Sequence, residues 1–320
     1  MADDEISAVS AFICRRGAIL EGTFPRDTGS YTISSCRVRF GWGVIPNDAW
    51  PHATFRSRPE PPGLDALAKA QRIPVYCRVT NIQEYMKCLR LCPIIAAFPV
   101  THDWFYALNG HIASPAPNTP VIGTHTLAML GFSMEEGVVK FINSWGNKWG
   151  DNGFGSMSFD FFERHLQEAW FCLPGKTTFP SGTGIMHWEH GHHTPLGIAH
   201  VIEYYDVAAD ERLAWAIVLQ RDNCLDLQDL FVKPQHRGRG IATKLIHGVK
   251  HLRKETVRPS LPLTGLIHPV DAGMFLEPIR KLTIQLGLDL GDSIVPWGRY
   301  IVRPVGKIWR SHRRKRHSSK

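Results

Sequence analysis

The sequence lacks the features that mark membrane-spanning and exported proteins. No segment approaches the ~18 uninterrupted apolar residues that a transmembrane helix requires, so a membrane span is excluded. The chain opens with MADDEI, which is acidic where a secretory signal is basic. Hydrophobic residues make up 43% and charged residues 21% of the chain, which are the proportions of a globular protein. We therefore expect a cytoplasmic protein with ordinary buried cores.

The sequence also lacks a paired cysteine framework. The number of cysteines is odd, and no two of them are spaced as Cys-x-x-Cys. The seven cysteines are Cys14, Cys36, Cys77, Cys88, Cys92, Cys172 and Cys224. This pattern favours reduced thiols, as in a cytoplasm, over a disulfide scaffold.

Acidic residues are missing from the C-terminal tail. From Lys307 to Lys320 there are seven Lys and Arg and no acid, which leaves +1 of the net charge of +8 for the rest of the chain. We predict a disordered basic tail over residues 306–320. Trp309 is its only aromatic residue, so base stacking has little support there. We predict no specific nucleic-acid partner and no membrane partner.

The length of 320 residues exceeds what one hydrophobic core usually organises, so we expect two domains. A link rich in Thr, Ser, Gly and Pro at Thr177–Gly184 separates them. Four helices are predicted in the first part. One has Ile33, Cys36 and Phe40 on one face, one spans Leu64–Ala70, one is capped by Asn81 with Glu84 three residues on, and one contains Phe162, Leu166 and Ala169. A strand is predicted at Pro93–Val100.

A β-hairpin pattern stands at the centre of the first part. The apolar run Leu127–Phe132 is followed by a polar connection and a second apolar run, Val138–Ile142. His125 opens the first strand and Asn143 closes the second, so antiparallel pairing would make the two side chains neighbours. An amide beside an imidazole can fix its tautomer, which is the third role in a nucleophile and base arrangement.

The residues that follow Asn143 carry a specific pattern. They read Asn-Ser-Trp-Gly, then Trp-Gly, then Gly-Phe-Gly, at fixed offsets over residues 143–155. In this block the chain resembles papain-like cysteine peptidases. The resemblance implies an α+β papain-like N-terminal domain over residues 1–175, with His125 as the base and Asn143 as its orienter. A structural alternative is that the tryptophans of this block only pack while its glycines turn the chain.

The nucleophile that the resemblance requires is not evident. A papain-like enzyme needs a thiolate at the start of a long helix, with an upstream Gln that stabilises the oxyanion. Cys14 is the only cysteine near the N-terminus, Arg15-Arg16-Gly17 follows it, and no Gln precedes it. Two explanations stay open: the domain has lost its nucleophile, or the cysteine lies upstream of Met1. We predict that this chain is inactive as a peptidase, with a cysteine peptidase as the alternative.

A second motif lies in the C-terminal half. An apolar strand ending in Leu230-Phe231-Val232 leads through Lys-Pro-Gln-His to the turn Arg237-Gly238-Arg239-Gly240, and Ile241-Ala242 opens an amphipathic helix. Glycines let the backbone approach a pyrophosphate, and the free N–H groups and positive dipole of the helix start attract the anion.

At this turn the chain resembles GNAT-family acetyltransferases, whose acetyl-CoA motif is Arg or Gln, two residues, Gly, one residue, Gly or Ala. Arg237, Gly240 and Ala242 fill those three positions. The resemblance implies an α/β GNAT-type domain with a mixed central sheet over residues 185–305, and acetyl-CoA as co-substrate. It also implies that the backbone of Leu230, Phe231 and Val232 meets the pantetheine. The remainder of the domain is predicted as strands at Pro195–Tyr205, Ala214–Leu219, Leu263–Ile267 and Tyr300–Val302 and a helix at Ala272–Leu286.

The second half also departs from its family pattern. The usual pair of N-terminal helices is not evident between Thr183 and Gly197, and the Tyr that often serves as general acid is missing from residues 272–286. Asp229 is the candidate catalytic acid or base, with Glu203 as a further possibility.

The histidine-rich stretch HWEHGHH at residues 187–193 is interpreted as a surface loop, because no cysteine or ordered carboxylate follows it, and we predict no metal site.

Taken together, the residues predict an acetyl-CoA-dependent N-acetyltransferase of an unidentified amine, fused to an inactive papain-like domain. The acceptor is a small molecule or a protein. A non-catalytic binding protein, with both halves degenerate, is the remaining alternative.

Overall fold

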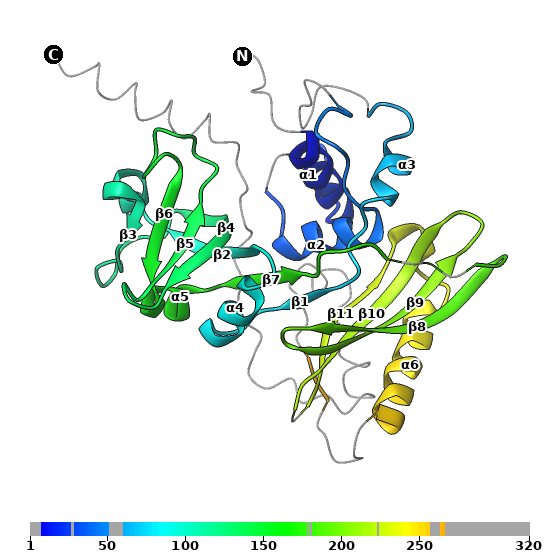
Figure 1. The fold of residues 1–320 in the computed structure, drawn as a ribbon. Coiled ribbons are helices and arrows are strands. Elements are labelled where there is room, and N and C mark those ends of the chain that lie inside the picture. The colour runs from blue at the N-terminus through cyan, green and yellow to red at the C-terminus, as the bar shows by residue number, and fades with distance from the viewer. Residues whose placement is uncertain are drawn as a thin grey trace.

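The computed structural model describes residues 8–26, 29–50, 60–177, 179, 181–222, 224–256 and 263–265. These residues form two β-sheets with helices around and between them (Figure 1). The predicted helix at Ala272–Leu286, the predicted strand at Tyr300–Val302 and the tail at 306–320 lie outside the described residues. Of the helices described, none is long and apolar enough to cross a membrane.

The first sheet has seven strands in the order β1-β7-β2-β4-β5-β6-β3. Its neighbours pair antiparallel, except for the parallel pair of β3 and β6. The strands are β1 (Tyr76–Arg78), β2 (Ile94–Val100), β3 (His111–Ile112), β4 (Gly123–Ser133), β5 (Val138–Ile142), β6 (Phe154–Ser158) and β7 (Glu168–Cys172). The helices beside it are α4 (Ile82–Leu89), α5 (Phe159–His165) and the short 3-10 turns η1 (His102–Tyr106) and η2 (Leu108–Gly110).

Two local predictions for this half are confirmed. Strands β4 and β5 form the expected antiparallel hairpin, in which Met129 lies opposite Phe141. Asn81 caps α4, because its Oδ1 accepts a hydrogen bond from the Glu84 backbone N–H at 2.9 Å. The Glu84 carboxylate in turn accepts the N–H of Thr80 at 2.8 Å, so two donors at the helix start are satisfied.

The predicted helix containing Phe162, Leu166 and Ala169 is wrong in its second half. Helix α5 ends at His165, and residues 168–172 form strand β7. All five residues of β7 are buried, and Ala169 pairs with Ala96 in the centre of the sheet. A short apolar run buried on both faces has the same composition as a buried helix, so periodicity could not separate the two.

The second sheet is mixed, with the strand order β12-β11-β10-β9-β8. Strands β8 to β11 form antiparallel pairs, and β12 lies parallel to β11. The strands are β8 (Ile185–Thr194), β9 (Gly197–Asp206), β10 (Glu211–Gln220), β11 (Leu225–Val232) and β12 (Leu263–Gly265). The predicted strands at 195–205 and 214–219 correspond to β9 and β10, and β12 is the described part of the one predicted at 263–267.

The interpretation of residues 187–193 as a surface loop is wrong. They belong to β8, which pairs with β9 along its whole length from Ile185 to Thr194. The side chains of Trp188, His190 and His192 are half-buried, while their neighbours on the other face are exposed. The sequence does not show this alternation of burial, because histidines occupy both faces of the strand.

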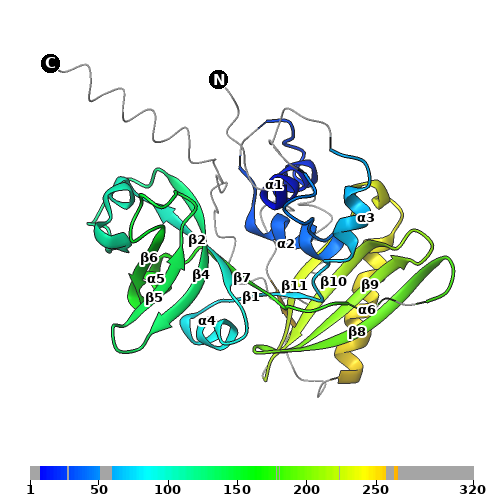
Figure 2. The same ribbon diagram turned by 45° about the horizontal axis from the view of Figure 1, so that its top comes forward.

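Helices cover both faces of the second sheet (Figure 2). Helix α6 (Ile241–Thr256) packs its Leu245, Ile246 and Val249 against one face. The opposite face packs against α1 (Ala8–Leu20), α2 (Thr32–Gly41) and α3 (Leu64–Lys69) from the N-terminal part of the chain. The helices on this face therefore come from residues far upstream of Gly197.

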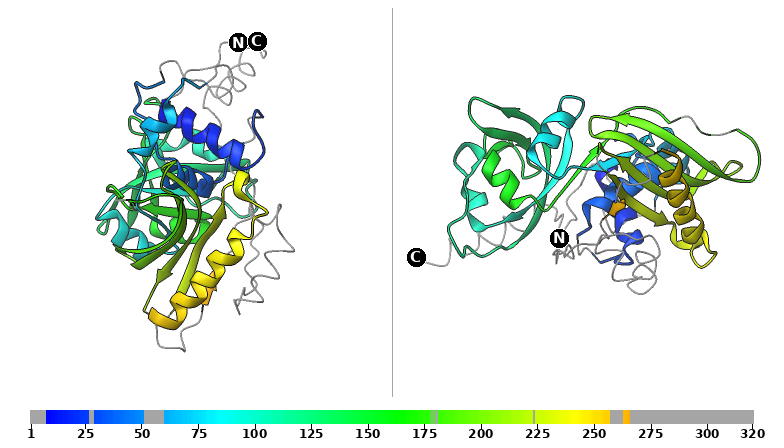
Figure 3. Two further views of the ribbon diagram at one scale, coloured as in Figure 1. Left: turned by 90° about the vertical axis from the view of Figure 1, so that its right-hand side faces the viewer. Right: turned by 90° about the horizontal axis from the view of Figure 1, so that it is seen from below.

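Helix α2 packs against strands of both sheets, and the two sheets lie side by side when the molecule is seen from below (Figure 3). The ring of Phe40 meets Trp215 of β10 edge to face at 5.1 Å and Tyr76 of β1 at 5.6 Å. A single apolar cluster therefore joins the helices, the edge of the first sheet and β9 to β11. The domain boundaries at 175 and 185 stay predictions.

Candidate functional site

The turn between β11 and α6 is open to solvent. After β11 the chain passes through a short 3-10 turn, η3 (Pro234–His236), and reaches Gly238 and Gly240, whose φ angles are +75° and +72°. A side chain would be strained at either position, although a Cβ would meet nothing within 4 Å. The space above both glycines is therefore free for a ligand.

The start of α6 presents backbone donors to that space. The first intrahelical bond runs from the Lys244 N–H to the carbonyl of Gly240 at 3.3 Å. The N–H groups of the residues between them have no acceptor within the helix, because a helix leaves its first donors unpaired. Together with the helix dipole, they make this end of α6 suited to an anion.

The two arginines of the turn have different positions. Arg237 folds back onto the strand end, where its Nε donates to the carbonyl of Val232 at 3.0 Å and its guanidinium lies 5.7 Å from the Phe231 ring. Arg239 is exposed. The first arginine thus fixes the turn against β11, and the second leaves a positive charge at its outer side.

Strand β11 contains a β-bulge next to this turn. Ile217 pairs with Asp229 and Val218 with Leu227, so Gln228 is the extra residue. In the described residues the parallel ladder with β12 covers only Leu225 to Leu227. The strand end at Leu230, Phe231 and Val232, predicted to meet the pantetheine, lies beyond both the bulge and this ladder.

Asp229 is buried in an ion pair. Its carboxylate accepts two bonds from Arg37 of α2, at 3.0 and 2.6 Å, and one each from the Tyr76 hydroxyl and the Trp215 indole. Burial acts to raise the pKa of Asp229, but the Arg37 charge and these bonds outweigh it and lower the pKa. Asp229 is thus held ionised and fully engaged, which does not favour its predicted role as a proton carrier.

Glu203 has a similar environment. Its carboxylate accepts from Arg212 Nε at 2.6 Å and lies 3.2 Å from His190 Nε2, and its side chain is completely buried. The Nδ1 of His190 lies 2.9 Å from the Nε2 of His192, which is a hydrogen-bond distance. Burial lowers the pKa of His192 to about 4, so this network contains a neutral imidazole at neutral pH.

The structure brings His125 and Asn143 together, as the hairpin pattern predicted. The Nε2 of His125 donates to the Oδ1 of Asn143 at 2.8 Å, and each residue is only 6% exposed. Because that oxygen can only accept, the hydrogen resides on Nε2 and the basic lone pair on Nδ1. Burial lowers the pKa of His125, and the bond to Asn143 partly opposes this effect.

Aromatic rings cover this pair. The ring of Trp145 lies 5.0 Å from that of His125, and Phe105 stacks on Trp145 at 4.8 Å. The indole of Trp149 donates to the carbonyl of Trp104 at 2.8 Å, which holds the turn to η1. The tryptophans of the Asn-Ser-Trp-Gly block therefore build the wall around the imidazole as well as packing the core.

The cysteines occupy other places. Cys14 lies in α1, Cys77 in β1, Cys88 in α4 and Cys224 just before β11. Cys36 and Cys172 contact each other, and Cys92 donates a hydrogen bond to a backbone carbonyl. Burial raises the pKa of Cys88 to about 12 and that of Cys92 to about 11. The described partners of His125 are Asn143, through a hydrogen bond, and the ring of Trp145, and they include none of these thiols.

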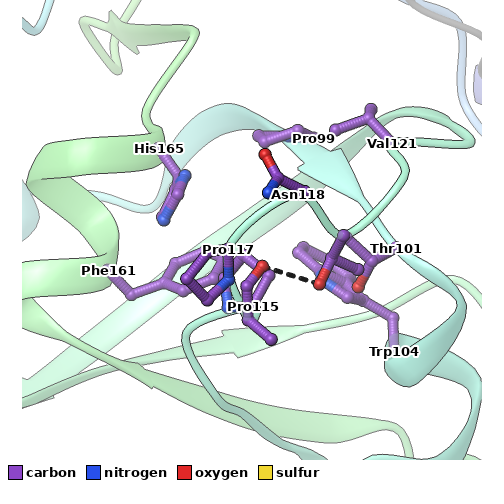
Figure 4. Close-up of a pocket in the computed structure, with 11 residues that line it drawn as sticks. Pro99, Thr101, Trp104, Pro115, Pro117, Asn118, Val121, Phe161 and His165 are labelled. Atoms are coloured by element: carbon purple, nitrogen blue, oxygen red, sulfur yellow. Dashed lines mark hydrogen bonds between the residues drawn. The ribbon is translucent and has the colours of Figure 1, made fainter.

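A pocket of about 290 Å³ lies beside Trp104, which is one of its lining residues (Figure 4). Proline and aromatic side chains line it, with His165 and Asn118 at its polar edge. Sequence analysis did not anticipate it, because its walls come from the end of β2, η1, the 115–121 segment and α5. His125 is not among its lining residues. In the part of the chain that the structure describes, no three metal-ligating side chains are grouped for a metal ion.

Two protein families match this chain. The papain family of cysteine proteases matches residues 65–166, and the acetyltransferase (GNAT) family matches residues 154–259. The first range contains His125, Asn143 and the tryptophans around them. The second contains the whole of β8 to β11, the glycine turn and α6.

Individual relatives belong to the peptidase side. The peptidase C1-like protein L477 of Acanthamoeba polyphaga mimivirus is 24% identical over 184 residues, which are 53% of this chain and 59% of the viral protein. A thiol protease aleurain-like of Arabidopsis thaliana is 35% identical over 68 residues, which are 20% of this chain and 19% of that protein. The crystal structure of xylellain, a cysteine protease from Xylella fastidiosa, is 24% identical, with a TM-score of 0.46, and the match covers 52% of this chain and 69% of that one.

The two family resemblances that the sequence motifs indicated are confirmed. The chain contains a papain-like region and a GNAT acetyltransferase region, whose matched ranges overlap at residues 154–166. The fold class of an α+β part followed by a mixed-sheet α/β part is also confirmed.

Proposed function

We propose that this chain, which joins a papain-like region to a GNAT acetyltransferase region, is an acetyl-CoA-dependent N-acetyltransferase of an amine. The observation that carries the proposal is the geometry after β11. Two glycines with positive φ angles stand under open space at the start of a 16-residue helix. A GNAT family match over the same residues supports an enzyme that uses acetyl-CoA.

The binding roles follow from that geometry. The N–H groups at the start of α6 would receive the pyrophosphate, with Arg239 supplying a charge from the solvent side. Arg237 would keep the turn in shape through its bond to Val232, so we assign it a positioning role. The bulge at Gln228 turns the end of β11, and the backbone of Leu230 to Val232 would pair with the amide groups of the pantetheine.

The transfer itself requires little acid or base chemistry from the protein. The co-substrate supplies an activated thioester, and an unprotonated amine attacks its carbonyl when the two are held together. Asp229 and Glu203 are occupied by Arg37 and Arg212, so we propose that neither carries the proton of the acceptor. The contribution of this chain would then be binding and orientation.

Calorimetric titration with acetyl-CoA tests the proposal. Gly240→Glu introduces bulk, negative charge and a strained φ at the turn, and we expect it to abolish measurable binding. Gly137→Glu is the matched control, because Gly137 also has a positive φ, of +64°, and open space around it, but lies in the β4–β5 turn. If both variants bind acetyl-CoA with equal affinity, the assignment of the site to the turn at Gly240 is wrong. If the wild type does not bind acetyl-CoA, a non-catalytic binding protein is favoured.

The second candidate function is that of a thiol peptidase. The bond from His125 to Asn143 and the cover of Trp145 are what a base and its orienter need. The seven cysteines lie elsewhere, so we propose that this chain is inactive as a peptidase. Labelling of any cysteine by an activity probe for cysteine peptidases, abolished by His125→Ala, would reverse that conclusion.

The cellular location and the partners of the protein are also proposals. We propose a cytoplasmic enzyme whose acceptor is a small-molecule or protein amine, with no specific nucleic-acid or membrane partner. A nucleic-acid titration at physiological ionic strength, compared between the full chain and a version without residues 306–320, checks the role of the basic tail.

A further inference from the structure

Two cysteines far apart in the chain meet at the junction of the two sheets. The Sγ atoms of Cys36 in α2 and Cys172 in β7 are 4.0 Å apart, and the residues are 136 positions apart in sequence. Cys36 is fully buried and Cys172 is 9% exposed. The distance is that of a thiol hydrogen-bonded to another sulfur, and a disulfide requires the two sulfurs to move to about 2 Å from each other.

A cation stands beside this pair. The guanidinium NH1 of Arg39, one turn further along α2, lies 3.9 Å from the Sγ of Cys172. The hydrogen bond from Cys36 lowers the pKa of the Cys172 thiol, burial opposes this effect, and the Arg39 charge lowers the pKa further. Burial raises the pKa of Cys36. Cys172 is thus the more acidic thiol of the pair, and the thiolate form is the one that reacts with an oxidant.

The neighbouring Cys77 and Cys92 differ from this pair in their hydrogen bonds, although Cys172 and Arg39 also affect the ionisation of Cys92. Cys92 donates its S–H to the backbone carbonyl of Cys172 at 3.4 Å, so it is aimed at the main chain rather than at the sulfur. Cys77 is fully buried in β1, and burial raises its pKa. Among the described residues, neither thiol is hydrogen-bonded to another sulfur atom.

We propose that Cys36 and Cys172 are a thiol oxidation site that a peroxide converts reversibly into a disulfide. The Cys172 thiolate attacks hydrogen peroxide, so that an S–O bond forms, the O–O bond breaks, and the departing hydroxide takes a proton to become water. The sulfur of Cys36 loses its proton and attacks Cys172, so that the S–S bond forms and a second hydroxide leaves as water. Two thiols are oxidised by two electrons, and one peroxide is reduced to two waters.

The disulfide would act on the layer that the two halves share. Helix α2 is already tied to β11 by Arg37 and Asp229, and its Phe40 packs on Trp215. A covalent bond from the same helix to β7 would fasten the first sheet to that layer. It would close a long loop, which restricts the unfolded chain and thereby stabilises the folded one.

Peptide mapping of the full chain tests this inference. The protein is reduced, freed of reductant, exposed to a small excess of hydrogen peroxide, and alkylated before digestion without reductant. We expect a linked peptide pair containing Cys36 and Cys172, which dithiothreitol separates. We also expect the oxidised protein to unfold several degrees higher than the reduced one.

Variants make the outcome specific. Cys36→Ser and Cys172→Ser should each abolish both the link and the shift in melting temperature, whereas Cys77→Ser should retain both. The proposal is overturned if Cys36 and Cys172 stay reduced at a peroxide dose that fully oxidises the half-exposed Cys14 and Cys224. So would a link from Cys172 to Cys92. These results come from the wild type and therefore stand even where a variant fails to fold.

Discussion

Arg37 and Asp229 join two parts of the chain that are 192 residues apart. The guanidinium of Arg37 donates to both carboxylate oxygens of Asp229, at 3.0 and 2.6 Å, and both side chains are 2% exposed. One residue belongs to α2 and the other to β11, so the ion pair lies where the helical layer meets the second sheet. Similar links hold the two halves elsewhere, from Arg72 to Asp210 and from Arg221 to Glu84. The papain-like part and the acetyltransferase part therefore share a structural junction.

The buried ion pair gives the first prediction. Asp229→Ala leaves the Arg37 charge buried without its partner, which costs about 3–5 kcal/mol of unfolding free energy. Replacing both residues by apolar side chains, Arg37→Met with Asp229→Leu, should restore much of the loss. Chemical denaturation measures the effect. The control is Glu136→Ala, which breaks an exposed pair with Lys140 and should change the unfolding free energy far less, because solvent screens that pair.

The same carboxylate should make stability depend on pH. The pKa of Asp229 is lowered in the folded state, so its contribution is present above the unfolded value of about 3.9 and is lost as pH falls through the folded pKa. We expect the stability gap between wild type and Asp229→Asn to be constant near neutral pH and to shrink only in strong acid. A gap that closes already between pH 7 and 5 would contradict the ion pair.

His125 gives a prediction that separates burial from hydrogen bonding. Burial lowers its pKa below the ordinary 6.5, and the bond to Asn143 acts in the opposite direction. Asn143→Ala removes that bond, so the pKa of His125 should fall further. Titration of the imidazole by NMR measures the change, with His125→Gln used to assign the signal. An unchanged or higher value in Asn143→Ala would mean that the two side chains do not pair in solution.

The glycines of the tryptophan block provide a further prediction. At Gly150 the φ angle is +58°, and a Cβ would overlap the carbonyl oxygen of Phe154. At Gly137 the φ angle is +64°, but a Cβ meets nothing within 4 Å. Gly137→Ala should cost about 1 kcal/mol for its backbone conformation alone. Gly150→Ala should cost clearly more in a melting or denaturant experiment, because the backbone must also move.

Local patterns were sufficient for part of this structure. The hairpin of β4 and β5, the cap at Asn81 and the turn at Gly238 and Gly240 depend on residues close in sequence, and each was predicted. Strand β8 was missed because polar histidines occupy an edge strand, where alternation does not separate apolar from polar residues. Strand β7 was taken for helix because five buried residues carry no period.

Contacts between distant residues were beyond such patterns. Nothing near Asp229 in the sequence announces Arg37 as its partner, so a buried carboxylate was interpreted as a candidate catalytic group. The same holds for Cys36 and Cys172, because the sequence predicted reduced thiols and gave no reason to place these two side by side. The contribution of α1 to α3 to the second sheet also depends on packing between segments at opposite ends of the described chain.

The central claim is that acetyl-CoA binds at the turn between β11 and α6. Backbone amide NMR of the isotope-labelled protein, titrated with acetyl-CoA, tests it most directly, because each N–H reports its own environment. We predict the largest shifts at Gly238, Gly240, Ile241 and Ala242, with Gly137 and Asn143 unaffected. Shifts that leave the start of α6 unchanged, or that appear only around His165 and Asn118, would contradict the assignment.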